Sequence, residues 1–169
     1  MTTNMSRRPK IIIELTLTDK VIEILGWLAL AILWTLTLLA FTDLPETIPT
    51  HYNGAGLVDN YGDKSTIFIL PIIGTLIFVL MTILNRFPHI FNYPTIITAE
   101  NAEKQYILAT RLIRYLKFAI VVIFLVIALM TIWTTNNKSE GLGPWFLPLF
   151  LGLVFIPVIV FIIKSVKTK

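Results

Sequence analysis

The side chains with the clearest chemical potential lie in one polar insert, residues 44–64, of a chain that is otherwise largely apolar. Within it, His51 and Asp59 are the two groups that could form an acid–base couple. Asn53 and Asp63 add oxygen atoms, but a metal site needs three or more converging donors. No serine or cysteine stands in a nucleophile motif. We therefore expect no metal, no cofactor and no catalytic residue here, and the remaining chemistry is recognition of a ligand.

The insert has the pattern of a β-hairpin. Two short strand-like runs, residues 47–52 and 57–61, flank the turn sequence NGAG, and such a turn is a strong hairpin signal. In the simplest interpretation, Asn53 and Asp59 bond to the backbone of their own turns and His51 bonds within the hairpin. The same hairpin could present a surface to a ligand or peptide, and the two interpretations are compatible.

The composition indicates a membrane protein. Hydrophobic residues make up 56% of the 169 residues and charged residues only 14%, whereas about a quarter of a soluble domain is charged. With a mean hydropathy of +0.79, the chain has too little polar surface to face water, so membrane protein is the expected class. The absence of cysteine excludes disulfides, thiol catalysis, iron–sulfur clusters and cysteine-bound zinc.

Four apolar segments are each long enough to cross a bilayer as a helix. They are residues 21–41, 65–84, 117–133 and 144–163. The predicted fold is an all-α membrane protein: one domain of four transmembrane helices, residues 21–163, with a short extracytoplasmic β-hairpin at residues 42–64 and a cytoplasmic loop and amphipathic helix at residues 85–116. Residues 1–20 and 164–169 are expected as cytoplasmic terminal segments. We place no charged residue deep in any span, which argues against an ion-coupled transporter.

The polar connections carry further expectations. Residues 11–17 alternate between apolar and polar side chains, as a strand does, and residues 93–98 are the best candidate to pair with them. Alternatively, the first stretch lies in the membrane interface. Thr18 or Asp19 can cap the first helix. Thr98 can cap the amphipathic helix, which is expected to run directly into the third span.

The basic residues predict the orientation of the chain. Four precede the first span, five lie from the end of the second span to Lys117 at the start of the third, and three follow the fourth, so twelve of the fourteen lie on one side. Lys64 and Lys138 are the two on the other side. Because basic residues stay on the cytoplasmic side, both termini are expected in the cytoplasm and the hairpin outside the cell. Membrane lipids, and not nucleic acid, are the expected partner of this positive charge.

Two groups of residues in the polar connections match the pattern of a known family. In the insert they are Pro45, Ile48, Pro49, His51, Tyr52, Asn53, Gly56, Asp59, Tyr61 and Lys64. In the second connection they are Asn92, Tyr93, Pro94, Glu100, Asn101, Ala102, Glu103 and Tyr106. With these motifs, about residues 27–133 resemble a bacterial membrane domain of unknown function. That domain forms the N-terminal part of SdpI-type immunity proteins and also occurs alone.

The resemblance implies a multi-pass protein of the bacterial plasma (inner) membrane. In SdpI-type relatives it implies protection against a secreted toxic peptide and sequestration of a transcriptional repressor at the membrane. The expected ligand- or partner-binding residues of the hairpin are His51, Tyr52, Asn53, Gly56, Asp59, Tyr61 and Lys64, with His51, Asn53, Asp59 and Lys64 as the main contacts. The cytoplasmic motif, which resembles the family's cytoplasmic segment, is Asn92, Tyr93, Pro94, Asn101, Glu103 and Tyr106. The chain departs from those relatives, because it has four predicted spans where they have more and shows no counterpart of their C-terminal half.

The expected function is non-enzymatic. We expect a membrane protein of immunity or signalling type that binds a toxic peptide, a lipid or a membrane-protein partner through the hairpin. The alternative is a small transporter subunit or a membrane enzyme that uses His51 and Asp59. The hypotheses differ in outcome: His51→Ala should remove protection, Asp59→Asn should stop turnover, and in a purely structural hairpin both substitutions should lower thermal stability.

Overall fold

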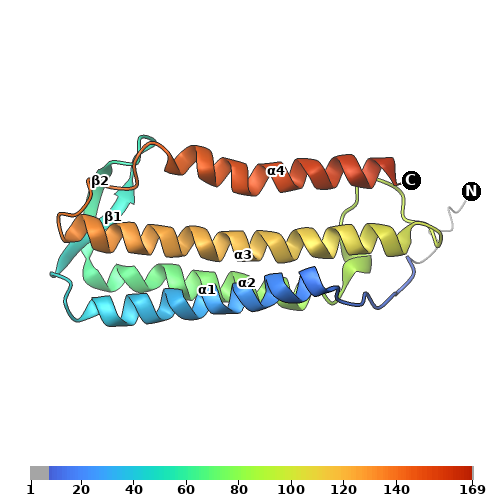
Figure 1. The fold of residues 1–169 in the computed structure, drawn as a ribbon, viewed down its shortest axis with the longest axis horizontal. Helices are drawn as coiled ribbons and strands as arrows, with labels where there is room; N and C mark the ends of the chain where they lie inside the picture. The colour runs from blue at the N-terminus through green and yellow to red at the C-terminus, as the bar shows by residue number, and fades with distance from the viewer. Residues whose placement is uncertain (1–7, 169) are drawn as a thin grey trace, which may run out of the picture.

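The computed structural model describes residues 8–168, in which long helices lie side by side along one axis (Figure 1). In chain order the elements are α1 (Leu17–Phe41), β1 (Thr47–Tyr52), β2 (Val58–Asp63), the 3₁₀ helix η1 (Lys64–Phe68), α2 (Ile69–Leu84), the 3₁₀ helix η2 (Pro88–Ile90), α3 (Ala102–Thr135) and α4 (Phe146–Lys167). The hairpin and the α3–α4 connection lie at one end, which we call the hairpin end. The segment before α1 and the end of α4 lie at the other, the termini end. Expectations for residues 1–7 and 169 fall outside the described residues.

The helices account for the apolar composition. Within residues 8–168, four helical segments are long and apolar enough to cross a membrane, namely Leu17–Phe41, Lys64–Leu84, Ala102–Thr135 and Phe146–Lys167. The predicted mostly helical fold with a two-stranded antiparallel hairpin is therefore confirmed. The side of the membrane on which the hairpin lies stays a prediction.

Helix α1 begins at Leu17 because a capping box starts it there. Thr16 Oγ1 accepts the backbone N–H of Asp19 at 3.3 Å, and Asp19 Oδ2 accepts the N–H of Thr16 at 3.0 Å. The two side chains thus satisfy backbone donors that the first turn leaves free. The expected cap at Thr18 or Asp19 is wrong, since Thr18 lies inside the helix and Asp19 supports the cap from its third position.

The strand predicted for residues 11–17 is also wrong. Residues 11–16 are not in a strand, and Leu17 is helical. The alternating side chains serve packing instead, because Ile11 and Ile13 lie against the cluster that contains Ile97, Ala102, Tyr106 and Tyr93. Residues 93–98 therefore lie beside this segment as expected, but the two do not pair as strands. Pro94 has no N–H to donate to such a pairing.

The core of the bundle joins α1, α2 and α3. Phe78 of α2 is fully buried against Ala29, Leu30 and Val121. Gly26 of α1 makes room for it, since a Cβ there would lie 2.6 Å from the Phe78 ring. Lipid is as apolar as this core, so close packing rather than removal from water holds membrane helices together.

Helix α3 runs the full length of the molecule (Figure 1). Its 34 residues continue unbroken from the polar stretch into the apolar one, so the expected amphipathic helix and third span are one element. Asn101, and not Thr98, is its N-cap. Thr98 lies in the preceding turn, where its N–H donates to Asn101 Oδ1 at 2.9 Å.

Helix α4 packs chiefly on α3, and no residue in its most apolar stretch is buried. At the termini end it is held by Gln105, whose Nε2 donates to Ser165 O at 2.9 Å and whose Oε1 accepts from Ser165 Oγ at 2.5 Å. At the hairpin end, the connection that leads into α4 contacts the hairpin. This helix is therefore fixed at both ends and apolar on its outer side, as expected of a helix that faces lipid.

Candidate functional site

The hairpin holds most of the predicted site residues, and Asn53 closes its turn. Asn53 Oδ1 accepts the backbone N–H groups of Ala55 at 2.9 Å and Leu57 at 3.1 Å. The two strands pair antiparallel, with irregular register around His51. Such irregularities bend a strand and turn its side chains out of the regular alternation. Asn53 thus fixes the turn, and the irregular register turns His51 out of the regular alternation of the strand.

The turn of the hairpin is docked on the α3–α4 connection. Gly56 O accepts the N–H groups of Leu142 at 2.7 Å and Gly143 at 3.3 Å, and Leu57 pairs with Gly141 as an isolated bridge. Gly56 has a φ of +78°, and a Cβ there would overlap the backbone of Gly143. Glycine is the residue that tolerates both conditions. The predicted site residue Gly56 therefore fixes the hairpin in place.

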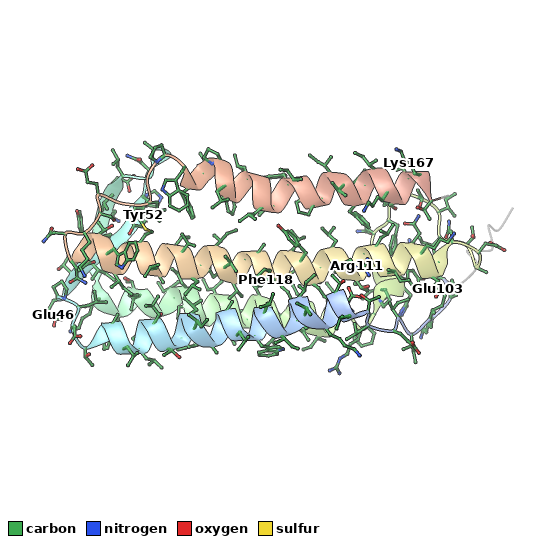
Figure 2. The ribbon with its side chains drawn as sticks, in the orientation of Figure 1. Glu46, Tyr52, Glu103, Arg111, Phe118 and Lys167 are labelled. Atoms are coloured by element: carbon green, nitrogen blue, oxygen red, sulfur yellow. The ribbon has the colours of Figure 1, made fainter. Side chains whose placement is uncertain are left out.

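The last residue of β1, Tyr52, anchors the hairpin on α3. Its hydroxyl forms a hydrogen bond with Thr131 Oγ1 at 2.8 Å, at the hairpin end of the molecule (Figure 2). Burial raises the pKa of Tyr52 above its ordinary value of 10.0, so this hydroxyl stays protonated. Leu44, Ile48 and Ile67 form a buried cluster beneath the strands. The hairpin is thus held at its turn and at its base.

His51 and Asp59 form an exposed pair on this fixed hairpin. His51 Nδ1 lies 2.6 Å from Asp59 Oδ1, and the imidazole N–H donates because an ionised carboxylate only accepts. The side chains are 67% and 40% exposed. Within the described chain, no other group bonds to the imidazole of His51. The pair therefore presents a ring nitrogen and a carboxylate oxygen to the outside.

The other predicted residues of the hairpin divide into two kinds. Tyr61 is 60% exposed and lies on the open surface. Lys64 is engaged, because its Nζ lies 2.9 Å from Glu46 Oε1 and 5.3 Å from the centroid of the Phe41 ring. Lys64 therefore ties the ends of the hairpin to α1 and does not join His51.

Asp63 also has a structural role. Its Oδ1 accepts the backbone N–H of Ser65 at 2.8 Å and so caps η1. The hydrogen bonds from Ser65 lower the pKa of the Asp63 carboxyl. Across residues 8–168, the histidine and acidic side chains form no group of three or more that could hold a metal ion.

The predicted cytoplasmic motif lies at the termini end. Like the hairpin residues, its members divide into buried residues that hold the fold and exposed ones. Tyr106 is fully buried, and its hydroxyl donates to Pro9 O at 3.1 Å. The ring of Tyr93 packs on that of Tyr106, with centroids 5.6 Å apart. Asn101 Nδ2 donates to Ile96 O at 3.0 Å. These three residues hold the chain segments around the start of α3. The exposed members of the motif are Asn92, Pro94 and Glu103, the last labelled in Figure 2.

A buried charge network at the termini end was not anticipated from the sequence. Its members are Asp19 and Glu23 of α1 and Arg111, Arg114 and Lys117 of α3. Arg111 Nε donates to Asp19 Oδ1 at 3.1 Å, and Arg114 lies 3.7 Å from Asp19 and 3.3 Å from Glu23. Asp19 and Lys117 are buried between the helices, but Asp19 lies in the first turn of α1 and Lys117 at the first residue of the predicted third span, so the expectation that no charge lies deep in a span stays a prediction.

Lys117 is the most buried member of this charge network. Its Nζ donates to Glu23 Oε2 at 2.7 Å and to Thr82 Oγ1 at 2.6 Å, and it lies 4.3 Å from the centroid of the Phe78 ring. An ammonium buried without partners would cost several kcal/mol. The three contacts offset that cost and join α1, α2 and α3 at one point.

Helical spacing is the sequence signal for this network. Asp19 and Glu23 are four residues apart, while Arg111, Arg114 and Lys117 follow one another at intervals of three. Residues three or four apart share one face of a helix, so the sequence contains one acidic face and one basic face. What it does not contain is the contact between α1 and α3 that brings the two faces together.

These features define the chain as a multi-pass membrane protein of unknown function. Residues 28–75, which hold most of α1, the hairpin and the start of α2, match a family described as a domain of unknown function, DUF1648. An uncharacterized protein of Archaeoglobus fulgidus is 36% identical over 88 residues, which is 47% of this chain and 48% of that relative. The chain thus spans about half the length of the curated relative that it matches. No solved structure matches the chain.

Proposed function

We propose that this is a non-enzymatic protein of the bacterial plasma membrane whose hairpin binds a secreted peptide outside the cell, in an immunity-type role. The observation that carries the proposal is the exposed His51–Asp59 pair on a hairpin held by its turn, by Tyr52 and by the buried cluster at its base. The resemblance to SdpI-type immunity proteins favours a toxic peptide as the partner. The absence of a third group bonded to His51, within the described chain, favours recognition over catalysis.

The exposed groups of the hairpin suit a peptide. Tyr61 is 60% exposed and Leu57 is 47% exposed, so an aromatic and an aliphatic side chain accompany the polar pair. Interfaces take most of their binding energy from a few such anchors, while polar groups fix the orientation of the partner. Because the hairpin is already ordered, binding need not order it, and a preorganised surface binds more tightly.

The proposed orientation places the hairpin outside the cell. Lys64 and Lys138 are the basic residues of the described chain at the hairpin end, and the positive-inside rule favours the cytoplasm for the more basic termini end. Since the chain has no cysteine, single cysteines can test this. Ala55→Cys should react with a membrane-impermeant maleimide on intact cells, and Lys104→Cys only after permeabilisation. The reverse pattern would place the hairpin in the cytoplasm.

A protection assay tests the role itself. Cells that lack the gene should become sensitive to peptides in the culture supernatant of cells that retain it, and the wild-type gene should restore growth. His51→Ala should fail to restore growth while it reaches the membrane at the wild-type level. Lys138→Ala, which alters an exposed side chain at the same end but off the hairpin, is the matched control and should restore growth.

Two results would contradict the proposal. Deletion could leave cells as resistant as before, or His51→Ala could protect as well as the wild type. An enzymatic role predicts a different result, in which the purified protein converts an envelope substrate and Asp59→Asn stops that conversion with the fold intact.

A further inference from the structure

A cavity of about 540 Å³ opens at the termini end beside the charge network. Its polar wall is formed by Glu23, Thr82, Asn85, Arg86 and Arg114. These residues come from α1, α2, α3 and the connection after α2, so the cavity lies where several elements meet. Its volume falls within the range of about 300–1,000 Å³ that small-molecule sites occupy.

Two polar atoms on this wall have no hydrogen-bond partner among the described residues. They are Arg114 Nε and Asn85 Oδ1. The Arg114 side chain is only 7% exposed, and although its Nε lies 3.3 Å from Glu23 Oε1, no hydrogen bond forms. Asn85 Nδ2 donates to Thr110 O at 3.1 Å, which leaves Oδ1 as the acceptor facing away from that bond. Since buried polar groups are nearly always bonded, the wall calls for one acceptor and one donor from a ligand.

The charge of the wall selects the kind of ligand. Arg86 and Arg114 both lie on it. Arg114 faces Asp19 at 3.7 Å and Glu23 at 3.3 Å, and Glu23 is shared with Lys117 at 2.7 Å, whereas Arg86 has no ion pair within the described chain. The remaining charge is positive and favours an anionic group. A phosphate would accept charge-assisted hydrogen bonds from the two arginines, and a neighbouring hydroxyl would supply the donor for Asn85 Oδ1.

The opposite wall is apolar and comes from the segment before α1. Ile11, Ile12, Ile13 and Leu15 lie on it, and the side chains of Ile12 and Leu15 are 93% and 41% exposed. This segment leads directly into α1, which is apolar enough to enter a membrane. Exposed apolar side chains beside a helix that can enter a membrane fit acyl chains better than water.

We propose that this cavity binds the head group of an anionic phospholipid of the phosphatidylglycerol type, from the leaflet at the termini end. The phosphate lies at Arg114 and Arg86, and a glycerol hydroxyl donates to Asn85 Oδ1. The acyl chains follow the isoleucines of the segment before α1. The bound lipid completes the hydrogen bonding of the charge network, and the site is independent of any partner of the hairpin.

The test uses the full chain in a neutral detergent, titrated with short-chain phosphatidylglycerol. Thermal unfolding should shift upward in a saturable way, and native mass spectrometry should show one retained lipid. Short-chain phosphatidylcholine and soluble glycerol 3-phosphate are the comparison probes, and each should give a much smaller shift. An equal shift with phosphatidylcholine would overturn the anionic assignment. An equal shift with glycerol 3-phosphate would overturn the lipid assignment.

Two charge-removing variants separate a built site from general attraction. Arg86 and Lys104 are both exposed basic residues at the termini end, but Arg86 lines the cavity and Lys104 does not. Arg86→Gln should weaken phosphatidylglycerol binding about tenfold, as expected for the loss of one charge-assisted hydrogen bond, while Lys104→Gln should leave it unchanged. Equal weakening by both variants, or by neither, would overturn the proposal.

Discussion

The His51–Asp59 pair and the charge network lie at opposite ends of the described chain and differ in burial more than in the distances between their partners. His51 and Asp59 approach to 2.6 Å, and Lys117 and Glu23 approach to 2.7 Å. The hairpin pair is 67% and 40% exposed, whereas the side chain of Lys117 is fully buried and that of Glu23 is 21% exposed. Two contacts of nearly equal length thus lie in very different surroundings, so the distance between partners does not show what a pair contributes.

Access to water explains why two pairs of nearly equal length contribute differently. An exposed pair contributes only about 0–1 kcal/mol, so the fold does not depend on it and its atoms are open to a partner. A buried charge cannot lose its partner without a large cost, so the buried members Asp19, Arg114 and Lys117 need their partners. We therefore expect stability to depend on the termini end and recognition to depend on the hairpin end.

The largest effect is expected from a break in the charge network at Lys117. Lys117→Met keeps the length of the side chain, removes its charge and leaves Glu23 with Arg114 alone. Removing one partner of a buried pair costs about 3–5 kcal/mol, and the remaining contact with Arg114 places this variant toward the lower value. Thermal unfolding of the purified protein in detergent, compared with the wild type, measures the loss.

A double variant separates charge from shape in that experiment. Glu23→Gln combined with Lys117→Met makes both members neutral, and replacement of a whole buried pair is often close to neutral in stability. Arg114 then keeps only Asp19, at 3.7 Å, so the double variant should recover part of the loss and not all of it. Unfolding of Lys117→Met at the wild-type temperature would show that burial does not make this network necessary.

The second effect concerns how firmly the hairpin is fixed. Gly56→Ala places a Cβ against the Gly143 backbone at a φ of +78°. A residue other than glycine in that conformation costs about 1–3 kcal/mol, and the overlap should undock the turn from the α3–α4 connection. Gly54→Ala is the matched control two residues away, because a Cβ there meets nothing within 4 Å. Equal melting temperatures for the two variants would contradict the docked hairpin.

The helices and the hairpin could be predicted because their signals are local. Four apolar runs and the NGAG turn each lie within one short stretch of sequence. The start of α1 was missed because two local signals overlap there. The residues before Leu17 alternate as a strand does, while Thr16 and Asp19 form the capping box of a helix. Packing of Ile11 and Ile13 against a distant segment accounts for the alternation, and no local pattern reports that contact.

The site was predictable in composition but not in arrangement. His51 and Asp59 could be grouped from the hairpin pattern, since the turn brings them to facing strands. Tyr52 and Gly56 were grouped with them, yet their partners lie in α3 and in the α3–α4 connection. The charge network depends on a contact between helices whose charged members, such as Glu23 and Lys117, are 94 residues apart. The binding roles predicted for the hairpin residues stay predictions.

A third, smaller effect tests the anchor between Tyr52 and α3. Tyr52→Phe removes the hydrogen bond to Thr131 Oγ1 and should lower the free energy of unfolding by about 1 kcal/mol, the usual worth of such a bond. Tyr61→Phe is the control, because the exposed Tyr61 lies on the open surface. It should change stability very little. If both variants melt with the wild type, the hydroxyl of Tyr52 does not hold the hairpin on α3.

The smallest effect on stability is expected where the effect on function is largest. His51→Ala and Asp59→Asn each remove an exposed pair, so each should lower the free energy of unfolding by less than about 1 kcal/mol. In the protection assay, His51→Ala should nevertheless behave like the deletion, because the surface offered to the peptide is gone. A loss of stability as large as that of Lys117→Met would show that the pair holds the hairpin together. The contrast between the two ends would then disappear, and with it the reason to assign recognition to the hairpin.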